Sequence, residues 1–303
     1  MKDIKPQGVV IPLVTPFTGE GEIDKRATVQ LLEHVVSQGC HPFILGTTGE
    51  STSIPMKSKL DYMKIAWKAN AGRKTFYAGI SGMSLEESIQ MGKTYADEGA
   101  DILVAHLPGY YPLPVQNMLR YYIDLADALP LPLILYNIKT TTHMSIPIEI
   151  VKKLSEHENI IGLKDSERDV NRLDDIAAYF RDRNDFSYLL GWAAKSSLAL
   201  KAGADGIVPG TGNAFPGLYY ELYLAIQEGD YEKGEKYQSI TNELSLVYQE
   251  GKLLSQALPG LKVMMENLGI CESHCLPPCY PLDSRETAAI VEKMRQIMKR
   301  IPE

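Results

Sequence analysis

The chain has 303 residues, in which 31 lysines and arginines stand against 38 aspartates and glutamates, so its net charge is −7. This balance disfavours nucleic acid and anionic membrane surfaces as partners, because both attract a basic face. Hydrophobic residues at 45% and charged residues at 23% are typical of a soluble globular protein. We find neither the pattern of a signal peptide nor a run of about 20 apolar residues that could span a bilayer. We therefore expect a cytoplasmic protein.

Short apolar segments alternate along the chain with longer segments of helical periodicity, a pattern typical of a parallel sheet covered by helices. The predicted strands are Gly8–Pro16, Pro42–Gly46, Thr75–Ile80, Asp101–His106, Leu133–Asn137, Ile160–Lys164, Tyr188–Gly191 and Gly206–Gly210. The predicted helices after them are Asp24–Gln38, Met56–Asn70, Ser84–Asp97, Val115–Ala128, Pro147–Ser155, Val170–Tyr179, Ala193–Lys201 and Ala214–Gln227.

Capping residues support these helix boundaries. Asp24 and Ser84 are good N-caps, and Gly39, Gly99 and Gly203 stand where helices should end. Eight strand–helix units in this length predict a (β/α)8 TIM barrel. An open doubly wound sheet is the alternative.

The residues after the eighth unit predict further helices at Tyr231–Gln249, Gln256–Leu268 and Ser284–Arg300. We therefore divide the chain into a barrel domain, residues 1–228, and a C-terminal helical extension packed on the barrel, residues 229–303. The extension could cover one side of the barrel or form a subunit interface, and the sequence does not distinguish these roles.

Lys164 is the most informative residue, because it ends an otherwise apolar strand. Strand side chains alternate between faces, so we expect Ile160, Gly162 and Lys164 to point into the barrel and Ile161 and Leu163 to point outward. Gly162 would leave room for the lysine stem. A buried ammonium loses hydration, which lowers its pKa and favours the neutral amine. A neutral lysine amine can attack a carbonyl group and form a Schiff base. The alternative is a strand-end lysine that extends into solvent.

Two more features accompany this lysine. Tyr136 lies at the end of its strand on the inward face, where its phenol could transfer a proton, although it could also be a packed aromatic. The segment Gly46-Thr-Thr-Gly-Glu-Ser51 follows the second strand, and its glycines, amides and hydroxyls suit a carboxylate better than a triphosphate. It could also be a tight strand–helix turn.

Together these motifs resemble the dihydrodipicolinate synthase/N-acetylneuraminate lyase family of class I aldolases. The resemblance spans nearly the whole chain. Its marks occur in the order and spacing of the family: Gly46–Ser51, Pro108-Gly-Tyr-Tyr111, Leu135-Tyr-Asn137 and Gly162-Leu-Lys-Asp165. It implies a (β/α)8 barrel with a C-terminal helical extension, usually assembled as a homotetramer. It also implies that pyruvate or a related 2-keto acid is a substrate together with an aldehyde, and that neither a metal nor a cofactor is required.

The resemblance assigns roles to individual residues. Lys164 would form the Schiff base and Tyr136 would shuttle protons. Thr47 and Thr48 would bind the carboxylate, and the Thr48 hydroxyl would link Tyr136 to Tyr111, a tyrosine that family members usually insert from a neighbouring subunit. The remaining residues assigned to the substrate pocket are Gly46, Gly191, Val208 and Thr141.

The segment after Asn137 departs from the synthase branch of the family, which usually has a proline and then a carboxylate-binding arginine there. Lys139 and Thr141 occupy these positions. Because lysine lacks the bidentate fork of arginine, aspartate semialdehyde is disfavoured as the aldehyde. The hydroxyls of Thr140–His143 suit a polyhydroxylated substrate, and the segment Ser273–Asp283 is similar to the tail of 2-keto-3-deoxygluconate-type aldolases. We therefore favour 2-keto-3-deoxy sugar acids, with dihydrodipicolinate synthase as the alternative.

Three other interpretations are weaker. Cys271, Cys275 and Cys279 recur every four residues, but two prolines interrupt them, so we expect thiols rather than a zinc site. A phosphate-binding barrel isomerase would use Pro209-Gly-Thr-Gly-Asn213, yet it would leave Lys164 without a role. A non-catalytic sensor of 2-keto acids would not need the complete set of reactive residues.

Overall fold

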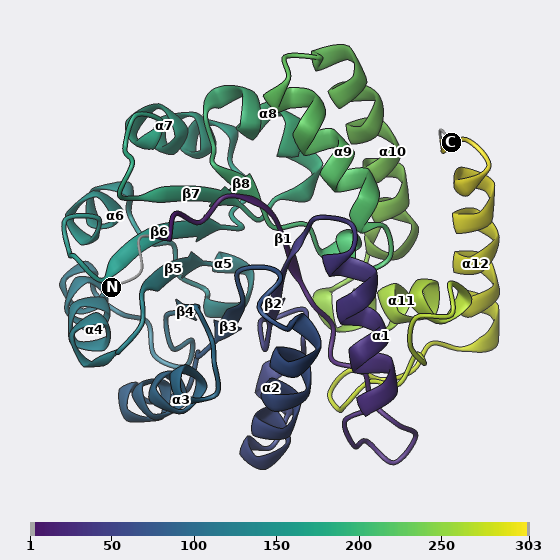
Figure 1. Cartoon of the computed structure of the whole chain (residues 1–303), viewed down its shortest axis with the longest axis horizontal. Helices are drawn as coiled ribbons and strands as arrows, with labels where there is room; N and C mark the ends of the chain where they lie inside the picture. Colours follow the sequence, from purple (N-terminus) through teal and green to yellow (C-terminus); the bar gives the residue numbers. More distant parts are fainter. Residues whose placement is uncertain (1–3, 302–303) are drawn as a thin grey trace.

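Eight parallel strands close into a ring, and helices surround it (Figure 1). The computed structural model describes residues 4–301, so the signal-peptide prediction concerns in part residues that lie outside it. The strands are β1 (Gly8–Pro12), β2 (His41–Ile44), β3 (Tyr77–Gly79), β4 (Ile102–His106), β5 (Leu133–Asn137), β6 (Ile160–Asp165), β7 (Ser187–Leu190) and β8 (Gly206–Ile207). Neighbours in sequence pair in the sheet, and β8 pairs with β1. The predicted (β/α)8 TIM barrel is confirmed, and the open sheet is wrong.

The main helices of the barrel lie close to their predicted positions. They are α1 (Lys25–Val36), α2 (Met56–Asn70), α3 (Leu85–Asp97), α4 (Val115–Ala128), α6 (Ile148–Leu154), α7 (Val170–Phe180), α8 (Ser196–Ala202) and α9 (Pro216–Gln227). The side chains of Asp24 and Ser84 accept hydrogen bonds from backbone N–H groups of α1 and α3, as expected of N-caps. Gly203 ends α8 with a φ of 106°, a conformation that glycine adopts without strain.

Three short helices were missed from the sequence and a fourth, residues 193–195, was predicted only as the start of the helix Ala193–Lys201, because three or four residues are too few to show helical periodicity. They are α5 (Lys139–Thr142) and the 3-10 helices η1 (Ser51–Ser53), η2 (Ala193–Lys195) and η3 (Gly210–Asn213). All four lie between the end of a strand and the main helix that follows it. They therefore shape the carboxyl-terminal rim of the barrel, where barrel enzymes hold their catalytic groups.

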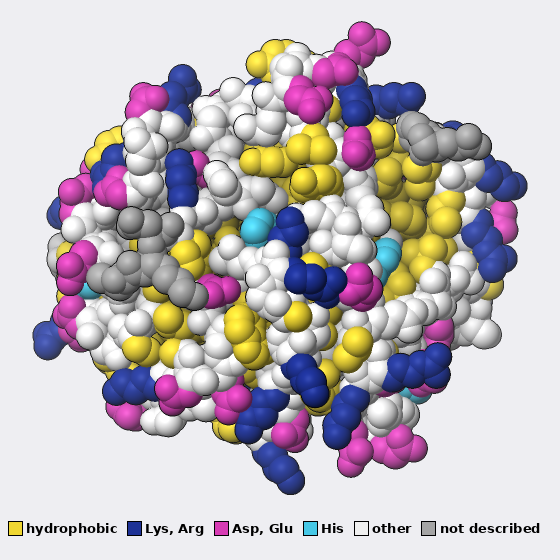
Figure 2. All heavy atoms as spheres, in the orientation of Figure 1, with side chains coloured by type: hydrophobic (Ala, Val, Ile, Leu, Met, Phe, Trp, Pro, Cys, Tyr) yellow, Lys and Arg dark blue, Asp and Glu magenta, His cyan; other side chains and the backbone are white. Residues whose placement is uncertain are grey.

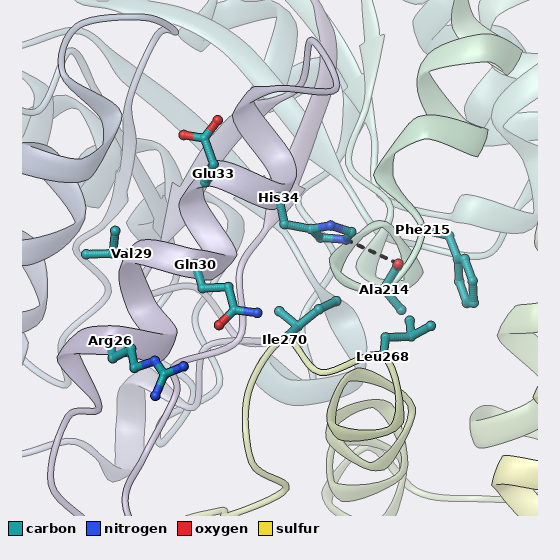
Figure 3. Close-up of a pocket in the computed structure, with 9 residues that line it drawn as sticks. All are labelled: Arg26, Val29, Gln30, Glu33, His34, Ala214, Phe215, Leu268 and Ile270. Atoms are coloured by element: carbon teal, nitrogen blue, oxygen red, sulfur yellow. Dashed lines mark hydrogen bonds between the residues drawn. The ribbon is translucent and has the colours of Figure 1, made fainter.

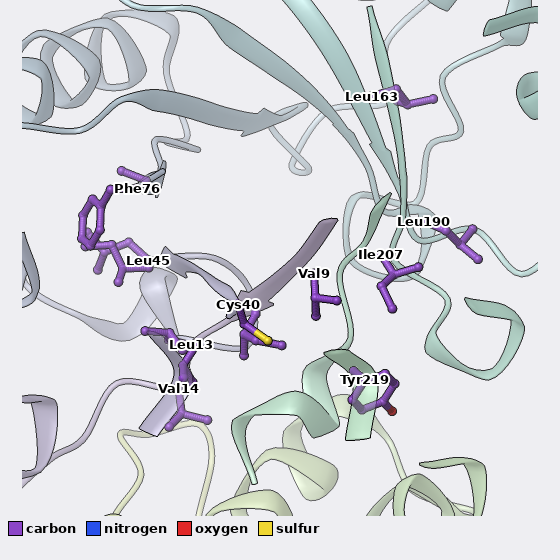
Figure 4. Packing of buried hydrophobic residues seen from close by; sticks show 14 of the residues in the cluster. Val9, Leu13, Val14, Cys40, Leu45, Phe76, Leu163, Leu190, Ile207 and Tyr219 are labelled. Atoms are coloured by element: carbon purple, nitrogen blue, oxygen red, sulfur yellow. The ribbon is translucent and has the colours of Figure 1, made fainter. Parts of the chain in front are cut away.

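Two layers of apolar side chains stabilise the barrel. The larger layer lies between the strands and the helices and includes Leu163, Leu190 and Ile207 (Figure 4). The smaller layer, here called the inner cluster, fills the barrel. Its members are Val10, Phe43, Tyr77, Ile102, Val104, Ile134, Tyr136, Ile138, Leu189 and Val208.

A β-bulge in β6 corrects the predicted orientation of two residues. Leu133 pairs with Ile160 but Ile134 pairs with Gly162, so Ile161 is the extra residue. As a result Ile160 packs in the outer layer and Ile161 packs against the inner cluster, opposite to the prediction. The prediction for Gly162 also needs correction: a Cβ there would lie 2.8 Å from the Ser187 carbonyl oxygen, so the glycine admits the β7 backbone rather than the lysine stem.

Three helices follow the barrel: α10 (Tyr231–Gln249), α11 (Leu254–Asn267) and α12 (Ser284–Met298). Helix α10 packs against α8 and α9, and α11 packs against α10 and α12. In Figure 1 these helices lie on the side of the barrel formed by α1 and α9. The domain boundary at residue 228 falls between α9 and α10 and stays a prediction.

The surface is consistent with the acidic composition. On the face shown in Figure 2, basic and acidic side chains are interspersed and no continuous basic surface is seen. Within residues 4–301, none of the helices combines the length and the apolar character that a bilayer span requires.

Candidate active site

Lys164 points from β6 into the barrel, as predicted. The residue is only 4% exposed. Its Nζ atom lies 3.7 Å from the ring centroid of Tyr136 and 4.8 Å from that of Phe43. Both rings belong to the inner cluster, so the amine is surrounded by the side chains that fill the barrel. It also lies one residue from the carboxyl end of its strand, where barrel enzymes carry out their chemistry.

Burial shifts the protonation equilibrium of Lys164. Desolvation lowers the pKa of its ammonium group, while the charge distribution and hydrogen bonding of the Tyr136 phenol partly oppose this shift. Burial and the neighbouring phenol thus determine the pKa of Lys164, and no carboxylate within residues 4–301 contributes to the shift. A larger share of neutral amine is the consequence, and the neutral amine is the nucleophile that attacks a carbonyl carbon.

Tyr136 lies beside Lys164 on the neighbouring strand, where the two residues form a register pair. Its hydroxyl is 3.4 Å from the Thr47 hydroxyl, at the long end of hydrogen-bond distance. The ring of His106 meets the Tyr136 ring edge-on, with 5.9 Å between centroids. Burial lowers the pKa of His106, whose Nδ1 lies 2.8 Å from the Leu107 carbonyl oxygen. Tyr136 is therefore held between Lys164, a hydroxyl and a desolvated imidazole.

The hydroxyl that contacts Tyr136 belongs to Thr47, whereas we predicted this contact for Thr48. The physical reason lies in the turn after β2. Leu45 has a φ of 56°, in the left-handed region, so the alternation of the strand does not continue into the loop. Thr48 instead lies toward η3: its Oγ1 would be 4.0 Å from a Cβ placed on Gly210. The two threonines thus face different neighbours across the mouth of the barrel.

Gly191 and Val208 directly follow the ends of β7 and β8. Val208 belongs to the inner cluster and is 3% exposed. The N–H of Gly191 donates to the Asp165 carbonyl oxygen at 2.6 Å, and a Cβ at this position would overlap the Ser166 hydroxyl. Ser166 was missed in the sequence, although its place two residues after Lys164 on the same face was a usable signal.

Tyr111 and Thr141, which were also predicted for the site, make their contacts elsewhere in this chain. Tyr111 is 72% exposed and stacks edge-on against Tyr110. Thr141 is exposed, and its hydroxyl donates to the Ile138 carbonyl oxygen in its own turn at 3.4 Å. Thr142 is buried and also donates to the Ile138 carbonyl oxygen, so its hydroxyl stabilises the segment rather than facing a ligand.

A polar network lies behind the end of β6 and was not found from the sequence. The carboxylate of Asp165 accepts hydrogen bonds from Asn137 at 2.9 Å and from Arg172 at 2.7 Å. Burial raises the pKa of Asp165, and the Arg172 guanidinium opposes this shift. The Asn137 amide also donates to Glu167, which forms an ion pair with Lys139. This network holds the segment that directly follows Lys164 against the end of β5 and the start of α7.

The two alternative ligand sites find little support in the geometry. The Asn213 side chain donates to the carbonyl oxygens of Pro12 and Gly210. The Thr211 hydroxyl lies 3.0 Å from the Tyr248 hydroxyl. These side chains hold η3 against β1 and α10, so they are not free to form a phosphate cradle. Within residues 4–301 no cluster of three or more histidine, cysteine or acidic side chains has the arrangement of a metal site.

A pocket of about 750 Å³ lies elsewhere, between α1, the start of α9 and the end of α11 (Figure 3). Val29, Phe215 and Leu268 form part of its apolar lining. His34 closes one side by hydrogen bonding with the Ala214 carbonyl oxygen at 3.2 Å. None of the residues around Lys164 lines this pocket, so its size does not make it the reaction site.

Comparison with known proteins agrees with this geometry. Residues 5–297 match the dihydrodipicolinate synthetase family. The chain belongs to this family. It is 31% identical to an uncharacterised DapA-like lyase of Thermococcus kodakarensis, an alignment that covers 96% of this chain and 98% of the relative. The family consists of pyruvate-dependent class I lyases, so the chain is an enzyme of the carbon–carbon lyase class.

Two solved structures show how closely the family fold is kept. YagE, a prophage protein from Escherichia coli K12 solved in complex with pyruvate, has a TM-score of 0.91 and 27% identity, covering 96% of this chain and 98% of YagE. Dihydrodipicolinate synthase from Bacteroides thetaiotaomicron has a TM-score of 0.89 and 32% identity, covering 96% of this chain and 98% of that enzyme. YagE, which is provisionally named a 2-dehydro-3-deoxy-D-gluconate aldolase, and the dihydrodipicolinate synthase are thus about equally similar to this chain. Similarity alone therefore does not identify the substrate.

Proposed function

We propose that Lys164 forms a Schiff base with a 2-keto acid and that the enzyme cleaves or forms a carbon–carbon bond to pyruvate, with 2-keto-3-deoxy sugar acids as its substrates. The observation that carries the proposal is the desolvated Lys164 amine in contact with the phenol of Tyr136. Burial of this kind lowers the pKa of the lysine ammonium and so increases the share of the neutral, nucleophilic amine.

The cleavage reaction would begin when the Lys164 nitrogen attacks the ketone carbon of the substrate. The Tyr136 phenol protonates the departing hydroxyl, so water leaves and a protonated imine forms beside a Tyr136 phenolate. The Tyr136 phenolate then takes the proton of the C4 hydroxyl, the C3–C4 bond breaks, and its electron pair moves into the imine to give an enamine. The aldehyde departs, C3 of the enamine is protonated, and water hydrolyses the imine to release pyruvate. The neutral Tyr136 phenol supplies the proton to C3 and regains one from the water that hydrolyses the imine, so no external acid or base is consumed.

Each of the remaining residues has a part in binding. We propose that the loop with Gly46, Thr47 and Thr48 binds the carboxylate and that Gly191 and Val208 border the pyruvate part of the pocket. Ser166 packs against Gly191, so its hydroxyl is a candidate to bind the aldehyde part of the substrate. Thr141 would bind a more distant hydroxyl, which requires its side chain to exchange its intrachain hydrogen bond for the ligand.

The sugar-acid assignment rests on the rim near α5. Thr141 stands where the synthase branch usually has an arginine, and Lys139 is already paired with Glu167 at 3.2 Å. A bidentate clamp for a second carboxylate is therefore not offered by these two residues. YagE, 27% identical over 96% of this chain, is provisionally named a 2-dehydro-3-deoxy-D-gluconate aldolase. Other relatives are named 4-hydroxy-tetrahydrodipicolinate synthase, which remains the competing assignment.

Turnover assays distinguish these assignments. The purified enzyme is offered 2-keto-3-deoxy sugar acids while pyruvate release is followed, and separately pyruvate with aspartate semialdehyde. We expect release of pyruvate from at least one sugar acid and little condensation with the semialdehyde. Thr141→Arg should increase the semialdehyde reaction. Rapid condensation by the unchanged enzyme would instead identify a synthase, and binding of pyruvate without turnover of any aldehyde would identify a sensor.

We also propose that the enzyme is a cytoplasmic homotetramer in which Tyr111 completes the site of a neighbouring subunit. Tyr110 and Tyr111 are 73% and 72% exposed and contact each other edge-on, so they present an aromatic pair that a neighbouring subunit could cover. Light scattering coupled to size-exclusion chromatography measures the oligomeric state. A monomer that remains fully active at assay concentrations would contradict the proposal.

A further inference from the structure

A buried ion pair joins the segment Gly46–Ser51, here called the catalytic loop, to the C-terminal extension. The Nζ atom of Lys262, on α11, lies 2.6 Å from Oε1 of Glu50, and the two side chains are 0% and 1% exposed. Glu50 directly follows the segment Gly46–Gly49, which carries the two threonines of the proposed carboxylate site. A pair that is this deeply buried carries a large desolvation cost unless further hydrogen bonds complete it.

Such hydrogen bonds are present on both partners. Lys262 also donates to the carbonyl oxygens of Thr15 and His274, at 2.8 and 2.6 Å. The other carboxylate oxygen of Glu50 accepts the N–H of Leu276 at 2.9 Å. The ammonium thus makes one ion pair and two hydrogen bonds, which link the segment after β1, the loop with Glu50, α11 and the tail after α11.

The pair reaches the threonines through the backbone of the loop. The Thr15 hydroxyl donates to the Gly49 carbonyl oxygen at 2.7 Å. Because Lys262 donates to the Thr15 carbonyl oxygen, it also supports the catalytic loop through Thr15. Glu50 itself has a φ of 56°, a left-handed conformation that a residue other than glycine adopts only when its surroundings impose it. Its N–H closes the loop on the Thr47 carbonyl oxygen at 3.2 Å. Movement of Glu50 would therefore shift Thr47 directly.

We propose that Lys262 is a positioning residue for the reaction: through Glu50 and Thr15 it holds the loop of Thr47 and Thr48 in the geometry that selects a 2-keto acid over a ketone without a carboxylate. The inference rests on the proposed function, because it concerns the same loop. It makes the C-terminal extension part of substrate selection, although the extension contributes no side chain that faces Lys164 in the proposed mechanism.

The test compares imine trapping by borohydride with two ketones, pyruvate and acetone, in the full-length protein. Trapping with acetone needs the Lys164 amine but no carboxylate site. In Lys262→Met we expect the preference for pyruvate over acetone to fall about tenfold or more, since small displacements of binding groups have effects of this size. Trapping with acetone should stay within about twofold of the unchanged protein.

A second variant covers the case in which Lys262→Met does not fold. Glu50→Gln removes the charge but keeps an oxygen that can accept the Leu276 N–H, and its preference for pyruvate should fall in the same direction. Lys252→Met is the matched control. Its ion pair with Glu286 at 2.7 Å also lies in the extension but is partly exposed, so its preference for pyruvate should not change.

Two results would overturn the inference and leave the proposed function standing. One is an unchanged preference for pyruvate in both folded variants. The other is an equal loss of trapping with both ketones, which would show a general structural role. Failure of the unchanged protein to trap pyruvate at all would contradict the proposed function instead.

Discussion

Two of the buried lysines, Lys164 and Lys262, differ in the polar groups around them. Lys164, in the barrel, is 4% exposed and contacts two aromatic rings. Lys262, at the junction with the extension, is 0% exposed and contacts a carboxylate and two carbonyl oxygens. The first amine is desolvated without a counter-charge, so its pKa is lowered. The second makes an ion pair with a carboxylate and donates two hydrogen bonds to carbonyl oxygens.

This difference separates a reactive amine from a structural one better than burial does. The Lys262 ammonium is held by a carboxylate and two carbonyl oxygens, so we assign it a structural role. A buried amine beside a phenol loses part of its charge and can attack a carbonyl carbon. The following experiments either sharpen or break this contrast.

The largest effect is expected at Lys164. Lys164→Ala removes the nucleophile, so turnover of the best substrate should fall by about a thousandfold or more. Steady-state assays of pyruvate release measure this effect. Activity within tenfold of the unchanged enzyme would show that another amine carries the reaction.

Stability should respond in the opposite way at the two lysines. Lys262→Met leaves the Glu50 carboxylate buried without its partner, which should lower the free energy of unfolding by about 3 kcal/mol. Lys164→Met replaces a desolvated amine by an apolar side chain of similar length and should not lower it. Urea unfolding at neutral pH gives both values, and the double variant Glu50→Gln/Lys262→Met should recover part of the loss. Equal destabilisation at the two sites would break the contrast.

A smaller effect is expected from the phenol beside Lys164. Tyr136→Phe removes a general acid and base, so kcat should fall about a hundredfold. The binding of a carboxylate should change much less. Inhibition by a non-reactive carboxylate analogue provides that second measurement. A change confined to binding would contradict the role of Tyr136 as the proton shuttle.

The pH dependence gives the smallest and most specific signal. The neutral amine becomes more abundant as pH rises through the pKa of Lys164, so the rate of imine trapping should rise with pH below the ordinary lysine value of about 10.4. Tyr136 raises this pKa against the effect of burial, so Tyr136→Phe should move the rise to lower pH. A shift to higher pH would contradict the assigned electrostatics.

Much of the fold and the placement of the candidate amine could be predicted from the sequence. Alternating periodicities indicated the barrel, and a lysine at the end of an apolar strand indicated a side chain that points into it. Both signals are local, because strand faces and helix boundaries depend on neighbouring residues. The capping role of Asp24 and the helix end at Gly203 were predictable for the same reason.

The remaining features depend on irregular backbone or distant contacts. The bulge at Ile161 reversed the predicted orientations of Ile160 and Ile161. After the left-handed Leu45, it is Thr47 rather than Thr48 that contacts Tyr136. The pair of Glu50 and Lys262 joins segments far apart in the chain, and no local pattern reports such a contact.

The most direct test of the account is the site of covalent capture. The unchanged enzyme is incubated with pyruvate, reduced with borohydride, and analysed by intact mass and peptide mapping. We predict one adduct per chain, equal to pyruvate minus one water plus two hydrogens, on Lys164, and none on Lys262. Capture at another lysine, or an unmodified protein at saturating pyruvate, would contradict the claim that Lys164 is the reactive amine.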